Sequence, residues 1–461
     1  MGIEYLGLSS INGPLVILEG VQDAFFDEIV EFTVDGKTKK IGRIIELYED
    51  KAVIQVFEGT ENMSLDNTRT KLTGHPMEVS LAPDMLGRTF NGIGKPIDGL
   101  GPLITDVKRD VNGLPLNPVR RKYPRNYIRT SISAIDGLTT LIRGQKLPIF
   151  SGNGLPHDQL AAQIVKQASL GDGSDEPFAV VFGAMGVKHD VADFFQKTFE
   201  ESGVADHVCM FLNLANDPVV ERLITPKVAL TAAEYLAFDC NMHIWVILTD
   251  MTSFAEAMRE VSSSKGEIPS RKGYPGYLYS ELATLYERAG IIEGAEGSVT
   301  QLPILTMPND DITHPIPDLT GYITEGQIVL DRNLNGQSIY PPISVLPSLS
   351  RLMKDGIGEG YTREDHQDLA NQLFSAYAKV GEARNLASVI GEDELSPIDK
   401  KYLEFGKEFE ERYIGQGSEE NRSMIETLDL GWELLKILPR EELDRIDTKI
   451  IDKYLPKKQE S

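Results

Sequence analysis

Residues Ser151 to Asp158, with the sequence SGNGLPHD, stand where a phosphate-binding loop would be expected. A short apolar run precedes them and a helical pattern follows. A strand, a glycine-containing turn and a helix start form the context of the P-loop G-x-x-x-x-G-K-[ST], whose backbone N–H groups and lysine hold phosphates. In this chain Pro156, His157 and Asp158 replace the second glycine, the lysine and the Ser/Thr of that motif.

Each replacement removes a property that phosphate binding requires. Pro156 has no N–H to donate. His157 is mostly neutral near pH 7, whereas the lysine of the motif is charged. Asp158 brings a carboxylate, which repels phosphate at contact distance. Backbone donors that would support residual nucleotide binding remain at Gly152, Asn153 and Gly154. The loop therefore has the frame of a nucleotide site without its chemistry, and an ordinary strand–turn–helix with two glycines would look the same.

Length, composition and net charge restrict the kinds of partner and site that this chain can have. The chain has 461 residues, enough for two or three domains, and a net charge of −24. That charge argues against nucleic acid and anionic lipid as partners, and leaves proteins and small ligands. No stretch reaches the roughly 18 apolar residues that a membrane-spanning helix needs. The two cysteines, Cys209 and Cys240, have no metal or redox spacing, so we expect small core residues and no metal site.

The middle of the chain alternates strand-like and helical patterns, which predicts a mostly parallel sheet with helices on both faces. The expected strands are 147–150, 178–182, 208–212 and 243–248, and the expected helices are 160–167, 191–202, 218–238 and 254–263. Asp250 follows the last of these strands. P-loop proteins hold magnesium with an aspartate in this position, but an aspartate that only caps the next helix would look alike.

The two ends of the chain have different patterns. Residues 1–75 contain short β-rich runs with a strong hairpin signal at Asp35-Gly36, which predicts a small β-barrel. Residues 77–101 are rich in Gly, Pro and Asp and predict a linker with several turns.

From Tyr361 onward the patterns are helical. Thr362 with Asp365 predicts one helix start, and Ser423 with Glu426 predicts a second start with a capping box. The apolar stripe expected for this second helix is Ile425, Leu428, Trp432 and Leu435. An acidic turn, residues 391–397, lies between helices and would suit a basic partner.

This order of parts, together with long shared stretches, resembles the hexamer-forming subunits of rotary ATPases, and most closely the non-catalytic B-type subunits of the vacuolar/archaeal (V/A) type. The resemblance covers essentially the whole chain. It rests on the stretches FEGTENM (57–63), LGRTFNGIGKPIDG (86–99), the 132–164 segment that contains SGNGLPH, GYPGYLYSELATLYERAG (273–290) and PPISVLPSLSRLMKDGIG (341–358). One departure is Ser344, where the family usually has Asp, Asn or His.

The resemblance implies a β-barrel at 1–75, an α/β nucleotide-binding-type domain with a degenerate P-loop at 76–350, and a helical bundle at 351–461. It further implies that Arg351 is an arginine finger, acting in trans on a nucleotide held by the catalytic neighbour. The glutamate that catalytic subunits carry after the second core strand is missing from the corresponding segment, Phe182-Gly183-Ala184-Met185-Gly186.

By the same resemblance, three copies of this chain would alternate with three catalytic A subunits, with ATP or ADP and magnesium at their interface and no cofactor bound tightly by this chain. The complex would include central axle subunits, a peripheral stalk and a membrane ring. It would couple ATP hydrolysis or synthesis to H⁺ or Na⁺ transport at the cytoplasmic face of the cell membrane. The candidate axle contact is Glu392, Asp393, Glu394 and Leu395.

Three alternatives stay open at this point. One is an ATPase subunit of the same architecture that is active in its own right, which would need a working P-loop. A second is a hexameric helicase, which would need a basic or aromatic nucleic-acid channel. The third is a structural spacer, from which only Arg351 separates the favoured interpretation.

Overall fold

The computed structural model describes residues 4–170 and 176–455 and divides the chain into two compact units. The first unit comprises the chain up to Asn117 together with Ala179–Arg288. The second unit comprises Pro118–Phe178 together with the chain from Ala289 onward.

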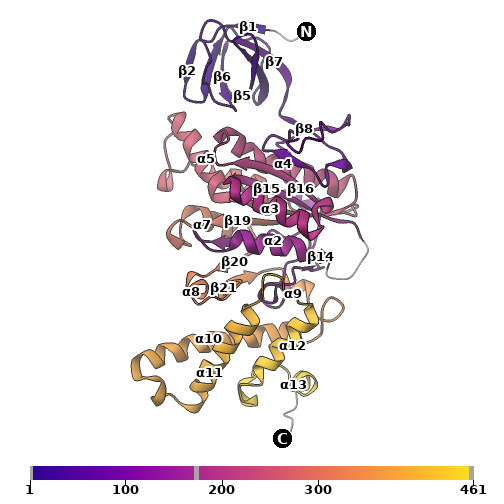
Figure 1. Ribbon diagram of the computed structural model, residues 1–461, viewed down its shortest axis with the longest axis vertical. Coiled ribbons are helices and arrows are strands. Elements are labelled where there is room, and N and C mark those ends of the chain that lie inside the picture. Colours follow the sequence, from indigo (N-terminus) through magenta and orange to yellow (C-terminus); the bar gives the residue numbers. More distant parts are fainter. Residues whose placement is uncertain (1–3, 171–175, 456–461) are drawn as a thin grey trace. The chain divides into compact units, whose positions relative to one another are not determined.

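The first unit begins with seven antiparallel strands that curl into a barrel around a buried apolar cluster (Figure 1). Their order is β1-β7-β4-β5-β6-β3-β2. Asp35 and Gly36 both adopt positive φ between β4 and β5, as the hairpin signal predicts. The barrel strands are β1 Glu4–Leu6, β2 Ser10–Asn12, β3 Leu15–Glu19, β4 Glu28–Val34, β5 Thr38–Tyr48, β6 Lys51–Val56 and β7 Arg69–Pro76.

The rest of the first unit is an α/β layer built on four strands in the order β17-β15-β16-β9. β15 pairs parallel with β16, and β16 pairs parallel with β9. The strands are almost fully buried apolar runs, as expected where helices cover a parallel sheet. The elements are β8 Glu78–Ser80, β9 Thr89–Asn91, β10 Lys108–Asp110, β15 Phe178–Val187, α3 His189–Ser202, β16 Val208–Leu214, α4 Val219–Phe238, β17 His243–Thr249, α5 Met251–Ser264 and α6 Leu278–Tyr286.

The second unit carries its own strands, among which β13 pairs parallel with both β19 and β20, and β21 pairs antiparallel with β20. The α/β elements are β11 Arg121–Lys122, β12 Ile128–Arg129, α1 Ser133–Asp136, β13 Ile149–Ser151, α2 His157–Gln167, β14 Ser169–Leu170, β18 Gly290–Ile292, β19 Ser298–Thr306, α7 Pro315–Ile323, β20 Gly326–Leu330, α8 Arg332–Gly336, β21 Ile343–Ser350 and α9 Met353–Gly356.

A helical bundle completes the second unit and packs around Trp432, Phe405, Phe409 and Tyr413. Its elements are α10 His366–Ile390, α11 Pro397–Glu408, a π-helical segment Phe409–Ile414, α12 Met424–Leu435 and α13 Thr448–Tyr454. The predicted capping box at the start of α12 is confirmed: Glu426 N donates to Ser423 Oγ at 3.2 Å, and Ser423 N donates to the Glu426 carboxylate at 2.7 Å.

Two expectations about the C-terminal helices are wrong, one about where a helix begins and one about which face is buried. The helix expected at Thr362 begins at His366, because the Thr362 hydroxyl accepts a hydrogen bond from Gly358 N and Asp365 pairs with Arg363. Ile425, placed in the apolar stripe, has 61% of its surface exposed, and the buried face of α12 instead includes Met424.

The linker expected at residues 77–101 is also wrong. This segment contains β8 and β9, and β9 adds an edge to the parallel strands through Phe90, which pairs with Phe211. Arg88 forms an ion pair with Asp98 that fixes the following turn and lowers the pKa of Asp98 to about 2. The glycines and prolines therefore shape tight turns within a folded layer.

The two cysteines are free. Cys209 is buried as expected, whereas Cys240 is only partly buried.

Candidate functional site

The degenerate loop closes on itself between β13 and α2. Leu155 N donates to Gly152 O at 3.1 Å, and His157 N donates to Leu155 O at 2.9 Å. Pro156 occupies the N-cap position of α2, where a side-chain acceptor or a free N–H would normally stand. The N–H of His157, which would point at an anion at this helix start, is therefore already used inside the loop.

The polar side chains of the loop bond to one another. His157 Nδ1 lies 2.9 Å from Ser151 Oγ, and its Nε2 lies 3.7 Å from Asp158 Oδ1. The imidazole is thus held against β13 rather than extended to the place that the terminal amine of a P-loop lysine would reach. Asn153 and Gly154 form the exposed tip of the loop.

Asp310 and Arg332 form a further barrier that the sequence did not reveal. Arg332 donates two hydrogen bonds to the Asp310 carboxylate, at 2.6 and 2.9 Å, and one to Asn153 O at 2.9 Å. A Cβ on Gly152 would lie 2.1 Å from Asp310 Oδ1, so a larger residue there would require this carboxylate, which Arg332 holds, to move. The hydrogen bond from Arg332 lowers the pKa of Asp310, which keeps a negative charge against the loop.

These contacts decide whether the loop suits a nucleotide phosphate. A phosphate needs converging N–H donors and positive charge. The loop offers a proline at the helix start and carboxylates from Asp158 and Asp310, and the nearby Arg332 guanidinium is already paired. The residues present do not fit a tightly bound Mg-nucleotide at this loop.

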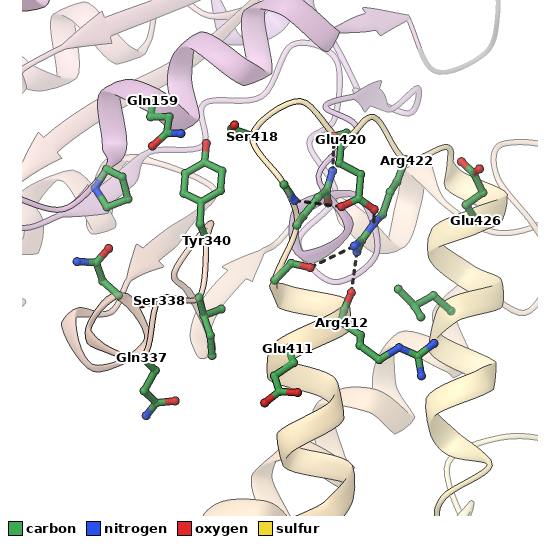
Figure 2. Close-up of a pocket in the computed structure, with 17 residues that line it drawn as sticks. Gln159, Gln337, Ser338, Tyr340, Glu411, Arg412, Ser418, Glu420, Arg422 and Glu426 are labelled. Carbon is green, nitrogen blue, oxygen red and sulfur yellow. Dashed lines mark hydrogen bonds and ion pairs between the residues drawn. The ribbon is translucent and has the colours of Figure 1, made fainter.

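A cavity of about 1000 Å³ lies beside the loop, between it and the helical bundle of the same unit. Figure 2 shows Tyr340 and Gln159 on one side and Glu420 and Arg422 on the other. Arg422 is fully engaged, because it donates to Glu420 at 2.6 Å and to the carbonyls of Arg412 and Gly415 at 2.9 and 3.1 Å. Arg422, one of two arginines that line this cavity, is therefore already bonded to groups of the bundle.

Arg351 follows β21 directly, in an exposed position. Its N donates to Glu325 O at 2.8 Å, and its Nη1 donates to Thr324 O at 3.0 Å. The neighbouring Ser350 Oγ donates to Thr140 O at 2.8 Å, which ties down the end of the strand. The guanidinium is thus oriented by one backbone carbonyl and carries no carboxylate partner within the described part of the chain.

Asp250 lies in the first unit, whereas the loop lies in the second. Its side chain accepts a hydrogen bond from Thr252 N at 2.8 Å and caps α5. The capping alternative thus accounts for one of its contacts. A magnesium role for Asp250 stays a prediction.

The acidic turn forms a short 3₁₀ segment, Glu392–Glu394, between α10 and α11. All three carboxylates are exposed. Leu395 is only 5% exposed, so it anchors the turn and is not available for an axle contact. The charged surface of the turn consists of these three acids.

Across 4–170 and 176–455, no group of three or more His, Cys, Asp and Glu side chains is arranged to hold a metal ion. In the same residues, no helix is both long enough and apolar enough to cross a bilayer.

Comparison with known proteins identifies the family. The nucleotide-binding domain of the ATP synthase alpha/beta family matches residues 131–350, its beta-barrel domain matches 8–74, and the C-terminal domain of V and A type ATP synthase matches 355–455. The positions of the three domain boundaries given above stay a prediction.

Relatives match along nearly the full length. The V-type ATP synthase beta chain 2 of Clostridium tetani is 64% identical over 98% of both chains. The V-type ATP synthase beta chain of Halothermothrix orenii is 63% identical over 98% of this chain and 97% of that one, and that of Thermotoga neapolitana is 59% identical over 98% of both.

A solved structure agrees with this match. The ATP synthase subunit NeqB from Nanoarcheaum equitans superposes with a TM-score of 0.73 at 38% identity, covering 92% of this chain and 98% of that chain. Family models, relatives and fold agree, and the chain therefore belongs to the V-type ATP synthase beta chains, the non-catalytic B subunits of V/A-type ATPases.

Proposed function

We propose that this chain acts on a nucleotide it does not itself hold, by presenting Arg351 to the phosphates bound by a catalytic A subunit beside it. The observation that carries the proposal is the contrast between two parts of one unit. The loop at 151–158 is closed by its own contacts and covered by carboxylates, whereas Arg351 is exposed, held by backbone and unpaired with any described carboxylate.

The chemistry of guanidinium suits this role. It is always charged at physiological pH, and its planar fork matches phosphate oxygens. An arginine supplied in trans accelerates phosphoryl transfer in other systems by roughly 10³–10⁵-fold. The hydrogen bond from Arg351 Nη1 to Thr324 O leaves the remaining N–H groups for such a contact.

The proposal places the chain in a larger assembly. Three copies alternate with three catalytic subunits, ATP or ADP with magnesium lies mainly on the catalytic side, and closure of the interface brings Arg351 to the terminal phosphate. The exposed acids Glu392, Asp393 and Glu394 face the central axle, while a peripheral stalk resists rotation. The axle couples to a membrane ring that carries H⁺ or Na⁺, at the cytoplasmic face of the cell membrane.

Substitution of Arg351 tests this proposal directly. Arg351→Ala, Arg351→Lys and the parent chain are each assembled with the catalytic partner. ATP turnover is measured beside nucleotide affinity and ring formation. We expect turnover of the Ala variant to fall by about 10³-fold while nucleotide affinity changes far less, because the finger contacts the transition state more strongly than the ground state. The Lys variant keeps the charge but loses the fork, and should recover only part of the rate.

A matched control is Arg440→Ala, which removes another half-exposed arginine of the same unit, paired with Asp452 at 2.6 Å. It should leave turnover unchanged. If Arg351→Ala turns over within a few-fold of the parent in intact rings, the arginine-finger role is wrong. The chain is then a structural spacer in the assembly, which the exposure of Arg351 alone does not contradict.

A further inference from the structure

A second cavity, of about 580 Å³, lies entirely within the first unit, between the barrel and helices α4 and α5. It is separate from the degenerate loop, Arg351 and the acidic turn, which all belong to the second unit. Its volume falls in the range of small-molecule sites, roughly 300–1,000 Å³.

Part of the lining of this cavity is apolar. Leu223 comes from α4, Phe254, Met258 and Val261 come from successive turns of α5, and Ile45 comes from barrel strand β5. Phe26, another residue of the lining, has 69% of its surface exposed. An exposed aromatic ring beside a buried apolar wall favours an apolar group in the cavity.

Most acids of the lining already accept strong hydrogen bonds. Glu46 accepts from the Tyr48 hydroxyl at 2.6 Å. Glu267 accepts from Ser262 Oγ at 2.6 Å and from the Tyr277 hydroxyl at 2.7 Å. Asp27 accepts from Asn112 Nδ2. These carboxylates have little need of a further donor.

The three cations of the lining are bonded less well. Lys265 Nζ lies 3.8 Å from Glu267 Oε1, on a side chain that is 19% exposed. Lys227 Nζ lies 3.3 Å from Asn112 Oδ1 and 3.9 Å from Glu281 Oε2, although its side chain is only 13% exposed. Arg43 reaches Gln55 Oε1 at 3.3 Å and Asp27 at 3.4 Å, both near the long limit of a hydrogen bond. Burial is the main cause that lowers the pKa of Lys227; Glu281 opposes this shift and Arg43 adds to it.

The hydrogen bonds of the lining therefore favour a ligand that brings a hydrogen-bond acceptor. Glu281 is 37% exposed and can be hydrated, whereas the ammonium of Lys227 is mostly shielded from water. A buried charge without full bonding is costly, and a charge-assisted hydrogen bond relieves that cost. We propose that this cavity binds a small molecule with an apolar chain or ring and a single carboxylate, held by Lys227 and Arg43. The proposal is independent of the role of Arg351.

Three isosteric probes test the proposal on the full chain: naphthalene-2-acetate, its neutral amide, and 2-(2-naphthyl)ethylammonium. Binding is measured by isothermal titration calorimetry. We expect saturable one-to-one binding of the acetate and at least tenfold weaker binding of the amide and of the ammonium, since one charge-assisted bond is worth about tenfold or more in affinity.

Variants assign the site. Lys227→Met keeps the length of the side chain and should weaken acetate binding about tenfold, and Lys227→Arg should restore most of it. Lys166→Met is the matched control, because this lysine of the second unit is similarly shielded, 19% exposed, and pairs with Glu419 at 2.7 Å. Its binding should equal that of the parent.

Other results would overturn the inference. Equal binding of the acetate and the amide would show an apolar cavity without anion recognition. Stronger binding of the ammonium would show that Glu281 and its neighbours select a cation. Absence of saturable binding, or full retention in a folded Lys227→Met chain, would show that no carboxylate site exists here. The parent fold of each variant is checked by its thermal transition.

Discussion

His366, at the start of α10, is a buried histidine that the structure holds neutral. Its Nε2 donates to Gly137 O at 3.0 Å, and its Nδ1 accepts from the Thr362 hydroxyl at 3.0 Å. Burial is the main cause that lowers its pKa from 6.5 to about 4. The pair of hydrogen bonds fixes one tautomer and links the bundle to the turn after α1.

This geometry predicts how the stability of the bundle depends on pH. In the window between pH 6.5 and about 4, the unfolded chain binds a proton at this site and the folded chain does not. The contribution of this neutral histidine to the free energy of unfolding is therefore fully present above pH 6.5. It is lost as the pH decreases through that window, and the free energy of unfolding falls by about 3 kcal/mol.

His366→Gln should flatten this part of the pH profile, because an amide can donate to Gly137 O without titrating. Urea unfolding is followed between pH 7 and pH 4 by the fluorescence of Trp432, which lies in the same bundle, in a Trp245→Phe background that removes the signal of the other tryptophan. His75→Gln serves as the matched control, since His75 is exposed and lies in the first unit. Identical slopes for His366→Gln and the parent would contradict the assignment.

At the scale of elements, the start of α12 offers a second prediction. Ser423→Ala removes the side-chain acceptor for Glu426 N, whereas the backbone N of residue 423 can still donate to the Glu426 carboxylate. The loss of an N-cap costs about 1 kcal/mol. Urea midpoints reported by Trp432 should fall accordingly.

Ser388→Ala is a suitable comparison for this substitution. Ser388 lies near the end of α10, where its hydroxyl donates to Asn385 O and caps no helix start. Its midpoint should stay within about 0.5 kcal/mol of the parent. Equal losses for the two variants would show that the capping box adds nothing specific.

The capping box and the hairpin at Asp35-Gly36 could be predicted from the sequence because their partners lie within three residues. The helix start at Thr362 was misplaced because the Thr362 hydroxyl serves Gly358 and His366 instead of a helix N-terminus. Residue spacing does not show whether a threonine hydroxyl will cap a helix or bond to another nearby group.

Contacts between distant segments were the other source of error. The strand at Thr89–Asn91 was missed because three residues carry little periodicity and their pairing partner is β16, far along the chain. The contact of Asp310 and Arg332 with the loop cannot be predicted for the same reason, since it is formed only by the fold. The degenerate character of the loop could be predicted, but its closure could not.

At the scale of the whole molecule, the capacity for hydrolysis is absent in more than one place. The loop has no lysine, and the segment 182–186 within β15 has no catalytic glutamate. In addition, Asp310 lies against Gly152. Restoring the motif alone, with Pro156→Gly, His157→Lys and Asp158→Thr, should therefore raise nucleotide affinity without giving turnover by this chain alone.

Equilibrium dialysis with ATP and phosphate release measure the two quantities separately. The same triple variant with Asp310→Asn should bind more tightly still, because the carboxylate against the loop has been neutralised. Measurable turnover by either variant without the catalytic partner would mean that this chain retains an active site of its own.

The division of the chain into two units also has a consequence for biosynthesis. Each unit is assembled from two separate segments, so neither is complete until a later part of the chain has been made. The ribosome adds Asn117 to the chain about ten to thirty seconds before Arg288, at a synthesis rate of about 5–20 residues per second. The barrel can form during that interval, since its strands pair only with one another. The nascent segment that follows it must wait with its apolar residues uncovered, and this interval is when a chaperone would most protect the growing subunit.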